Sequence, residues 1–340
     1  MVVESAGPER RPTLTDLART AGVSVALASI VMRDAPGASE ATRARVKIIA
    51  DELGYRPDRR AKLLRQTRSR LLGVTFEVRQ AFHGDLIEGI YAAAEPAGYG
   101  VLLSGVAPGR SEARAIAALQ DDRCEALILL GPRTATGRLN DVAKRQPVVV
   151  VARTVRSAAI ECVRVDDVVG MDLAVGHLAD LGHRRIAYLD GRSAPGGRER
   201  LRGFEMAVAR LGLTGAVVLP GGPAEEDGVG AAAALLPRVG EITAAIGFND
   251  RCATGVLDTF VRAGIAVPDQ FSIVGYDDSR LSRISYIDLT TVGQDPVELA
   301  RRSVERVVAR LDHGATDRQD QLVEPVLRIR GTSSPCRSSA

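Results

Sequence analysis

Residues 13–32 of this chain read TLTDLARTAGVSVALASIVM and carry its most informative local pattern. Apolar residues recur at helical spacing on both sides of Gly22, and glycine suits the positive φ of a tight turn between helices. Thr13 or Thr15 can cap the first helix, and Ser24 can cap a second helix over Val25–Met32, because their side-chain oxygens accept backbone N–H groups. The stretch therefore predicts a helix-turn-helix, a unit typical of DNA-binding proteins.

On the C-terminal side of this stretch, Ser39 can cap a third helix from Glu40 to Leu53, and Gly54 is placed to end it. The following segment, Arg56 to Arg70, is strongly basic and contains Asp58 as its single acid. So many like charges make a short helix marginal in isolation, but phosphate would neutralise them. We therefore expect this segment to fold on DNA.

The charge of the chain is unevenly placed. Its 45 basic and 42 acidic residues give a net charge of +3, yet the basic excess lies within residues 1–70 and the remainder is slightly acidic. This segregation is the footprint of a phosphate-binding module. A solvated basic tail is the alternative, but here the charges are interleaved with apolar positions of a helical pattern.

Composition excludes several classes of protein. The chain has 340 residues, 45% of them hydrophobic and 26% charged, as expected for a globular protein with an ample core. The sequence has no run of about 18 apolar residues, so no membrane span is predicted. The polar N-terminus does not have the pattern of a signal peptide, and we therefore expect a cytoplasmic location. The four cysteines form no CxxC pair, and His177 and His183 are isolated from other ligand types. We therefore expect reduced thiols, structural histidines, and neither a metal nor a cofactor.

From Leu71 onward, short apolar runs alternate with amphipathic segments, which favours parallel doubly wound sheets. The expected strands are Leu71–Val78, Val101–Ser104, Ala126–Leu130, Pro147–Ala152, Cys162–Val165, Arg185–Leu189, Ala216–Leu219, Ala244–Phe248 and Phe271–Tyr276. The expected helices are Gly84–Ala97, Arg110–Asp121, Gly170–Leu181, Arg200–Leu211, Arg251–Ala263 and Pro296–Asp312. So many strands predict two similar α/β lobes rather than one sheet.

Several motifs, in their joint order, resemble the lactose-repressor (LacI) family of bacterial transcription regulators. The resemblance covers residues 13–332 and is carried by the Thr-x-x-Asp-Leu-Ala…Ala-Gly-Val-Ser run at 13–24, Glu52–Pro57, Val165–Asp167, His177–Ala187, Phe248–Asp250, Val274–Asp278 and Leu289–Gln294. It implies an all-α helix-turn-helix headpiece joined to an α/β two-lobe, periplasmic-binding-protein-like sensor. The implied divisions are the headpiece at 13–57, a hinge at 58–70 and the sensor at 71–332. Outside them, residues 1–12, which are polar with Pro8 and Pro12, and residues 333–340 are expected to be disordered tails.

The resemblance places base-reading residues at the start of the second helix, with side chains in the major groove. These are Val25, Ala26, Ser29 and Ile30, with Ser24 or Thr13 reaching phosphate. Family members commonly carry Thr where this chain has Leu27 and Arg where it has Ile30. An isoleucine can contact a thymine methyl but cannot form the bidentate bond of arginine to guanine.

Three hypotheses follow for base specificity. Apolar readout together with hinge contacts can suffice, or specificity can have moved to Arg33 or the Arg43–Lys47 patch. In the third hypothesis, DNA binding is weakened and the apolar face of the second helix contacts another protein. Operator selection with an Ile30→Arg variant separates the first from the others.

The resemblance also assigns the hinge. Leu64 matches a leucine that family members insert between base steps of the minor groove, flanked here by Arg59, Arg60 and Lys62. Charge would hold the backbone while the apolar wedge unstacks a step and bends the duplex. The alternative is that Leu64 packs against its dimer mate.

Candidate effector contacts lie at strand ends, where parallel sheets form ligand crevices. They are Gln80, Phe82, His83, Arg198, Asn249 and Asp277. An aromatic face with an arginine, an amide and a carboxylate suits a sugar, and equally a nucleoside or another polar metabolite. The alternatives are that Asn249 and Asp277 only cap helices, Arg198 forms a surface ion pair, and Phe82 belongs to the core. The loop at 77–83 departs from the family's Asn-Pro-Phe-Phe pattern, which leaves the ligand class open.

Together these features predict a DNA-binding transcriptional repressor controlled by a small polar effector, a sugar above other classes. The expected partners are a near-palindromic double-stranded operator and a second copy of the chain, as a dimer or a dimer of dimers. Whether the effector is an inducer or a corepressor stays open. An enzyme is not expected, because GxGxxG after the first strand, GxxxxGK[ST], GxSxG and HExxH are all absent. The alternative is a solute-binding protein with the same two lobes and no use for residues 13–70.

Overall fold

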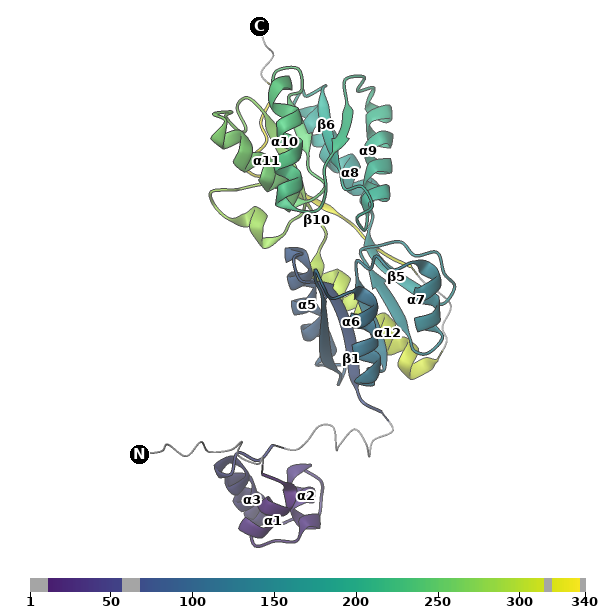
Figure 1. Ribbon diagram of the computed structural model, residues 1–340, viewed down its shortest axis with the longest axis vertical. Coiled ribbons are helices and arrows are strands. Elements are labelled where there is room, and N and C mark those ends of the chain that lie inside the picture. Colours follow the sequence, from purple (N-terminus) through teal and green to yellow (C-terminus); the bar gives the residue numbers. More distant parts are fainter. Residues whose placement is uncertain (1–11, 57–67, 315–319, 337–340) are drawn as a thin grey trace, which may run out of the picture. The chain divides into compact units, whose positions relative to one another are not determined.

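The computed structural model describes residues 12–56, 68–314 and 320–336 (Figure 1). The chain divides between Ser69 and Arg70 into two compact units. The first is helical, and the second is an α/β unit of two lobes.

The described part of the helical unit has the predicted helix-turn-helix. Its helices are α1 (Leu14–Thr20), α2 (Val25–Met32) and α3 (Glu40–Glu52). Each begins after a predicted cap: Thr13, Ser24 and Ser39 accept the backbone N–H three residues on. Gly22 has φ of +63° between α1 and α2, as the turn requires. Leu17, Val31, Val46 and Tyr55 bury their side chains in a small core.

No single helix in the described part of the chain is long and apolar enough to cross a membrane. Helices α1 and α2 pass a test of length and hydropathy only as a pair, and that pair is bent by 105°.

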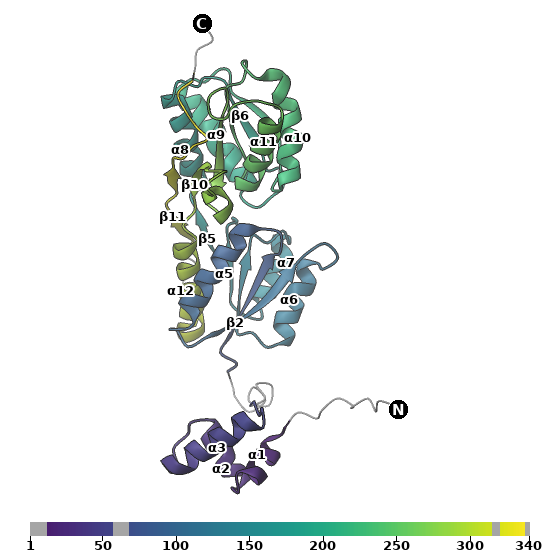
Figure 2. The same cartoon turned by 90° about the vertical axis from the view of Figure 1, so that its left-hand side faces the viewer.

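The N-terminal lobe (residues 70–165, 296–314 and 320–323) contains a six-stranded parallel sheet in the order β11-β5-β4-β3-β1-β2. Its strands are β1 (Leu71–Glu77), β2 (Gly100–Val106), β3 (Ala126–Leu130), β4 (Val148–Val151), β5 (Ile160–Val165) and β11 (Gln321–Val323). Its helices are α5 (Ala81–Ala94), α6 (Glu112–Asp121), α7 (Thr136–Ala143) and α12 (Pro296–His313). Figure 2 shows α5 and α12 side by side on one face of the sheet, with α6 on the other. Because both faces are covered, every residue of β3 and β4 is buried.

The C-terminal lobe (residues 166–295 and 324–336) repeats this plan with the order β12-β10-β9-β8-β6-β7. Its strands are β6 (Ile186–Asp190), β7 (Val217–Pro220), β8 (Ala244–Ile246), β9 (Ser272–Asp277), β10 (Thr290–Gly293) and β12 (Val326–Arg328). Its α-helices are α8 (Asp167–Asp180), α9 (Gly197–Leu211), α10 (Glu225–Leu235) and α11 (Asp250–Arg262), and short 3-10 turns lie at Leu236–Arg238 and Arg280–Arg283. Only the edge strand β12 runs antiparallel, against β10.

The chain passes between the lobes three times, from β5 to α8, from β10 to α12 and from β11 to β12. The prediction of two doubly wound lobes is therefore confirmed. Helices α7 and α10 and the short strands β10, β11 and β12 were not among the expected elements.

The expectation of a disordered tail at 333–340 is wrong for residues 333–336, which bind the C-terminal lobe. Ser334 N–H donates to Ser272 Oγ (3.1 Å), and Cys336 N–H donates to the carbonyl of Leu181 (2.7 Å). The two predicted structural histidines take part: His177 Nε2 lies 2.9 Å from Ser333 Oγ, and His183 Nε2 lies 3.1 Å from the carbonyl oxygen of Ser334. Residues 1–11 and 337–340, expected to be disordered, lie outside the described residues.

Candidate functional sites

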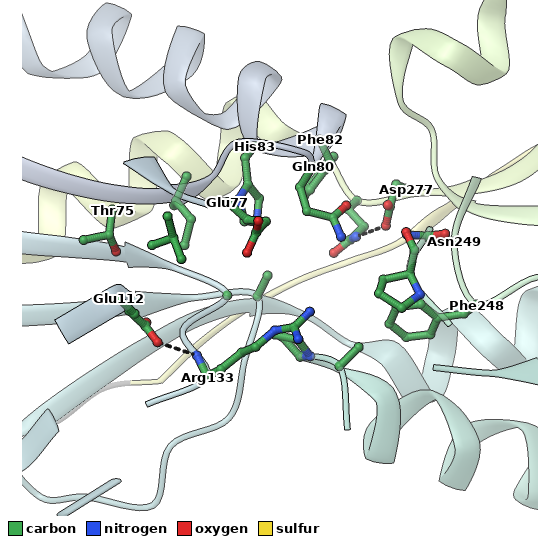
Figure 3. Close-up of a pocket in the computed structure, with 18 of the residues that line it drawn as sticks. Thr75, Glu77, Gln80, Phe82, His83, Glu112, Arg133, Phe248, Asn249 and Asp277 are labelled. Atoms are coloured by element: carbon green, nitrogen blue, oxygen red, sulfur yellow. Dashed lines mark hydrogen bonds between the residues drawn. The ribbon is translucent and has the colours of Figure 1, made fainter. Parts of the chain in front are cut away.

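A cavity of about 270 Å³ lies between the two lobes of the α/β unit. It is formed at the carboxyl ends of strands from both sheets, the usual place for a ligand in open α/β folds. Strand β1 contributes Thr75 and Glu77, β9 ends in Asp277, and Asn249 follows β8. Figure 3 shows these side chains around the cavity. Polar groups from both lobes thus converge on one space.

Most of the residues predicted for an effector site line this cavity, namely Gln80, Phe82, His83, Asn249 and Asp277. The predicted Arg198 does not line it and is exposed, whereas Arg200 does line it. Two residues that are two positions apart on a helix point about 200° apart, so only one of the arginines can face inward. Arg200 precedes the buried Gly203 and Phe204 by three and four residues and shares their face. That spacing was the available signal for choosing Arg200.

Arg200 is 5% exposed, and each nitrogen of its guanidinium group has a polar partner within the protein. Its Nε donates to Asp167 Oδ1 (3.0 Å), its Nη1 donates to the carbonyl of Phe248 (2.6 Å), and its Nη2 lies 3.5 Å from Asp277 Oδ1. The guanidinium carbon also lies 3.7 Å from the centre of the Tyr276 ring. The charge of Arg200 is therefore compensated within the protein, first by Asp167 and then by Asp277.

Asp277 does not cap a helix, which settles one of the alternatives. Its φ is +121°, and its Oδ1 accepts a hydrogen bond from Gln294 Nε2 (2.5 Å). Behind it, Asp250 accepts hydrogen bonds from the N–H and hydroxyl of Ser279. Burial raises the pKa of both carboxyls, while Arg200 lowers that of Asp277. Asp277 in the cavity wall and Asp250 behind it are therefore two buried carboxyls, and Arg200 offsets the charge of Asp277.

Asn249 and Phe82 each have a structural role and also line the cavity. Asn249 Oδ1 accepts the N–H of Cys252 (2.9 Å) and caps α11, while its Nδ2 donates to the carbonyl of Pro223 (3.1 Å). Phe82 is 6% exposed and belongs to the hydrophobic core, yet it also borders the cavity. Both residues shape the cavity, and the amide of Asn249 is already engaged.

His83 is held in one neutral form. Its Nδ1 accepts the backbone N–H of Glu77 (3.0 Å), so the proton of the neutral ring must lie on Nε2. Burial lowers the pKa of His83 to about 4, so the ring carries no charge at neutral pH. Nε2 lies near Gly131 in the cavity wall, where its N–H is a donor that a ligand could use.

Four polar residues of the N-terminal lobe line the cavity without having been predicted: Thr75, Glu77, Glu112 and Arg133. Glu112 Oε2 accepts the backbone N–H groups of Arg133 (2.9 Å) and Thr134 (2.8 Å). Glu112 Oε1 and Thr75 Oγ1 are buried and find no hydrogen-bond partner among the described residues. Glu77 ends β1 and Arg133 follows β3, so position at a strand end was the available signal for these two.

On the helical unit, the predicted base-reading residues lie on α2. Val25 and Ala26 are exposed, and Ser29 and Ile30 are half-buried. Ile30 packs beside the following loop, since its side-chain carbons lie within 3.9 Å of the point that a Cβ of Gly37 would occupy. The exposed start of α2 is thus apolar.

The other predicted DNA contacts are distributed as follows. The hydroxyls of Thr13 and Ser24 act as helix caps. In the alternative base-reading patch, Arg43 donates to the carbonyl of Ala35 and Lys47 pairs with Asp34 at 2.8 Å. The hinge residues lie outside the described part of the chain: Arg59, Arg60, Lys62 and Leu64.

Metal coordination finds no support in the part of the chain that the structure describes. There, no three His, Cys, Asp or Glu side chains are grouped in a way that could hold an ion.

Comparisons with known proteins agree with both units. The model for bacterial regulatory proteins of the lacI family matches residues 13–58, and the model for a periplasmic binding protein-like domain matches residues 175–333. The HTH-type transcriptional regulator GalR of Escherichia coli K12 is 32% identical over 330 residues, covering 95% of this chain and 96% of that protein.

Two solved structures extend the comparison. A LacI transcriptional regulator from a Rhodococcus species is 48% identical with a TM-score of 0.76, covering 78% of this chain and 98% of that one. The lac repressor dimer bound to operator and the anti-inducer ONPF is 29% identical with a TM-score of 0.80, covering 96% of this chain and all of that one.

Proposed function

This chain belongs to the lacI family of bacterial regulatory proteins, and we propose from that premise how it regulates transcription. It is a DNA-binding repressor rather than an enzyme. Its affinity for the operator is set by a small polar effector, a sugar above other classes, bound between the lobes. The observation that carries this proposal is the polar cavity at the facing strand ends of two lobes.

The helical unit reads the operator. The N-terminal end of α2 enters the major groove with the exposed Val25 and Ala26 against base edges, and Ser29 and Ile30 follow on the same helix. Methyl contacts from this face favour thymine. The basic hinge, with Arg59, Arg60, Lys62 and the wedge Leu64, supplies phosphate contacts and bends the duplex.

The effector couples to DNA through the lobes. Each lobe supplies part of the cavity wall, so a ligand that contacts both favours the closed arrangement over the open one. The three passages of the chain between the lobes allow such a movement. On the surface, Arg280 of the C-terminal lobe pairs with Asp85 (2.9 Å) and Glu88 of α5 in the N-terminal lobe. These exposed pairs are weak enough to break and re-form as the lobes move.

The assembly is a homodimer on a near-palindromic operator, in the cytoplasm. The lac repressor neighbour is described as a dimer bound to operator. A two-fold protein matches a two-fold DNA site, so each headpiece meets one half-site. Light scattering of the purified chain tests the dimer directly, and a dimer of dimers is the alternative assembly.

A DNA-mobility assay at about 50 and 200 mM salt tests the repressor function. Phosphate neutralisation predicts a specific shift whose affinity falls steeply, by roughly a thousandfold or more for 6–10 phosphate contacts. A solute-binding protein would give no specific shift at either salt concentration. Operator selection with wild type and Ile30→Arg then tests readout, since an unchanged base preference means that position 30 does not touch a base.

A further inference from the structure

Resting on the proposed function, we propose that the N-terminal side of the cavity selects effectors by charge. Thr75, Glu77, His83 and Glu112 form a subsite for an uncharged or amine-bearing end of a polyol, and this subsite excludes phosphorylated and other anionic effectors. We name these four residues the N-lobe subsite.

The first support is a pair of polar atoms that the protein leaves unsatisfied. Thr75 is 1% exposed, lines the cavity, and its Oγ1 has no hydrogen-bond partner among the described residues. Glu112 Oε1 is also buried and without a hydrogen-bond partner among the described residues, although Glu112 Oε2 accepts two backbone N–H groups. A buried carboxylate oxygen without a donor costs free energy, which a ligand hydroxyl or ammonium would recover.

The second support is the type of hydrogen bond on offer. A carboxylate only accepts, so Glu112 and Glu77 require donors on the ligand. The hydroxyl of Thr75 accepts or donates, and Nε2 of His83 donates. A sugar hydroxyl both donates and accepts and matches this set. A phosphate dianion or carboxylate has only acceptors to offer.

The third support is the charge balance of the whole cavity. Glu77, Glu112 and Asp277 are acidic, whereas Arg133 and Arg200 are the basic residues of the lining. Arg200 is already paired with Asp167 and Asp277. This leaves the guanidinium of Arg133 as the one cation in the described lining that can meet a ligand, against the carboxylates of Glu77 and Glu112. His83 adds no positive charge, because its ring is neutral.

An anionic group on the N-lobe subsite would therefore lie among like charges in a partly buried space. Two unit charges repel strongly where the effective dielectric is well below that of water. A neutral hydroxyl adds no repulsion, and an ammonium would reduce the negative charge. The subsite thus discriminates by repulsion as well as by fit.

Calorimetry with the full chain tests this inference through matched ligand pairs. The probes are D-galactose against D-galactose 6-phosphate, D-ribose against D-ribose 5-phosphate, and D-glucose against D-glucosamine. We expect at least one neutral sugar to bind, and its phosphorylated form to bind at least tenfold more weakly. The glucose and glucosamine pair decides whether the subsite prefers a hydroxyl or an amine.

Two substitutions and a matched control locate the effect. Thr75→Val keeps the shape but removes the hydroxyl, and should weaken the binding sugar about tenfold. Glu112→Gln lets the remaining oxygen keep the two backbone N–H groups while an NH₂ replaces the free acceptor, and should narrow the gap between neutral and phosphorylated forms at least tenfold. Thr154 is the control: its Oγ1 is also buried without a partner among the described residues, but it does not line the cavity, so Thr154→Val should leave sugar affinity unchanged.

A phosphorylated sugar that binds as tightly as its neutral parent overturns the inference. So does a panel in which no neutral sugar binds, or an equal loss of affinity in the Thr75 and Thr154 variants. Specific operator binding, measured separately with and without each sugar, stays detectable in at least one of the two states if only the inference fails. Absence of specific operator binding in both states would instead contradict the proposed function.

Discussion

Replacing Arg200 by glutamine should strongly destabilise the α/β unit. Arg200 is 5% exposed, and Asp167, its partner at 3.0 Å, is 6% exposed. Removing one member of a buried ion pair leaves an uncompensated charge and costs about 3–5 kcal/mol. The stacked contact with Tyr276, at 3.7 Å from the guanidinium carbon to the ring centre, adds about 1 kcal/mol. We therefore expect a total loss of about 4–6 kcal/mol.

Arg198→Gln is the matched control for this substitution. It removes the same side chain two residues earlier on α9, where the arginine is exposed and forms no part of the cavity lining. An exposed substitution of this kind should change stability by at most about 0.5 kcal/mol. Urea unfolding of both variants, followed by circular dichroism, measures the difference. Equal losses in the two variants would refute the assignment of Arg200 as the buried anchor.

The pH dependence of the Arg200→Gln variant gives an independent check. Burial raises the pKa of Asp167, and Arg200 opposes that rise. Without the arginine the folded-state pKa rises further above the unfolded value, so the folded variant takes up a proton that the unfolded chain does not. The stability deficit should therefore shrink as pH falls from 7 toward 5, by up to about 1.4 kcal/mol per pH unit for one proton. A deficit that grows over this range contradicts the mechanism.

Three further predictions concern the packing of α8, the headpiece and the hinge. Gly170→Ala should lower the free energy of unfolding by about 1–3 kcal/mol, because the added Cβ would lie 2.3 Å from Tyr276 Oη. Gly176→Ala on the same helix is the control: its Cβ meets nothing within 4 Å, and it should raise the free energy of unfolding by about 0.5–1 kcal/mol. Similar unfolding midpoints for the two variants would contradict the packing. Ser24→Ala removes the cap of α2 and should lower headpiece stability by about 1 kcal/mol, measured as faster amide exchange in α2 of the full chain; unchanged exchange would show that the cap is not needed. Leu64→Ala should reduce operator bending in a circular-permutation mobility assay, and undiminished bending would count against the wedge.

Much of the fold was predictable because its strongest signals are local. Strands such as β3 and β4 are buried on both faces and therefore read as uninterrupted apolar runs. Caps such as Ser24 act on a backbone group three residues away, so their role is visible in the sequence. Helix α10 was missed because its sequence, EEDGVGAAAAL, contains two glycines and no strong apolar stripe.

The ordered structure of residues 333–336 could not be predicted, because it depends on partners that are distant in the sequence. Ser334 bonds to Ser272, and their separation of 62 residues leaves no trace in the local pattern. A polar, serine-rich end is compositionally typical of disorder. Its order comes from hydrogen bonds to the C-terminal lobe, including those with His177 and His183.

Cavity-lining residues that directly follow a strand could be predicted from the sequence. Those whose position depends on the phase of a helix or on a tertiary contact could not. Asn249 and Asp277 stand at strand ends and were identified. Choosing Arg198 over Arg200 was an error of helix phase, which the buried Gly203 would have resolved. Glu112 lies at the start of a helix, and only the folded sheet brings it beside Thr75 in one cavity wall.

Coupling between the cavity and the operator site can be measured as operator affinity with and without effector. Fluorescence anisotropy would give the operator Kd of the full chain at zero and at saturating concentrations of the sugar that binds most tightly in calorimetry. We expect a change of about 5–150-fold, and an equal change in sugar Kd when operator is present, since coupling between two binding sites is reciprocal. An operator Kd that stays constant at saturating sugar would show that the cavity and the operator site are not coupled.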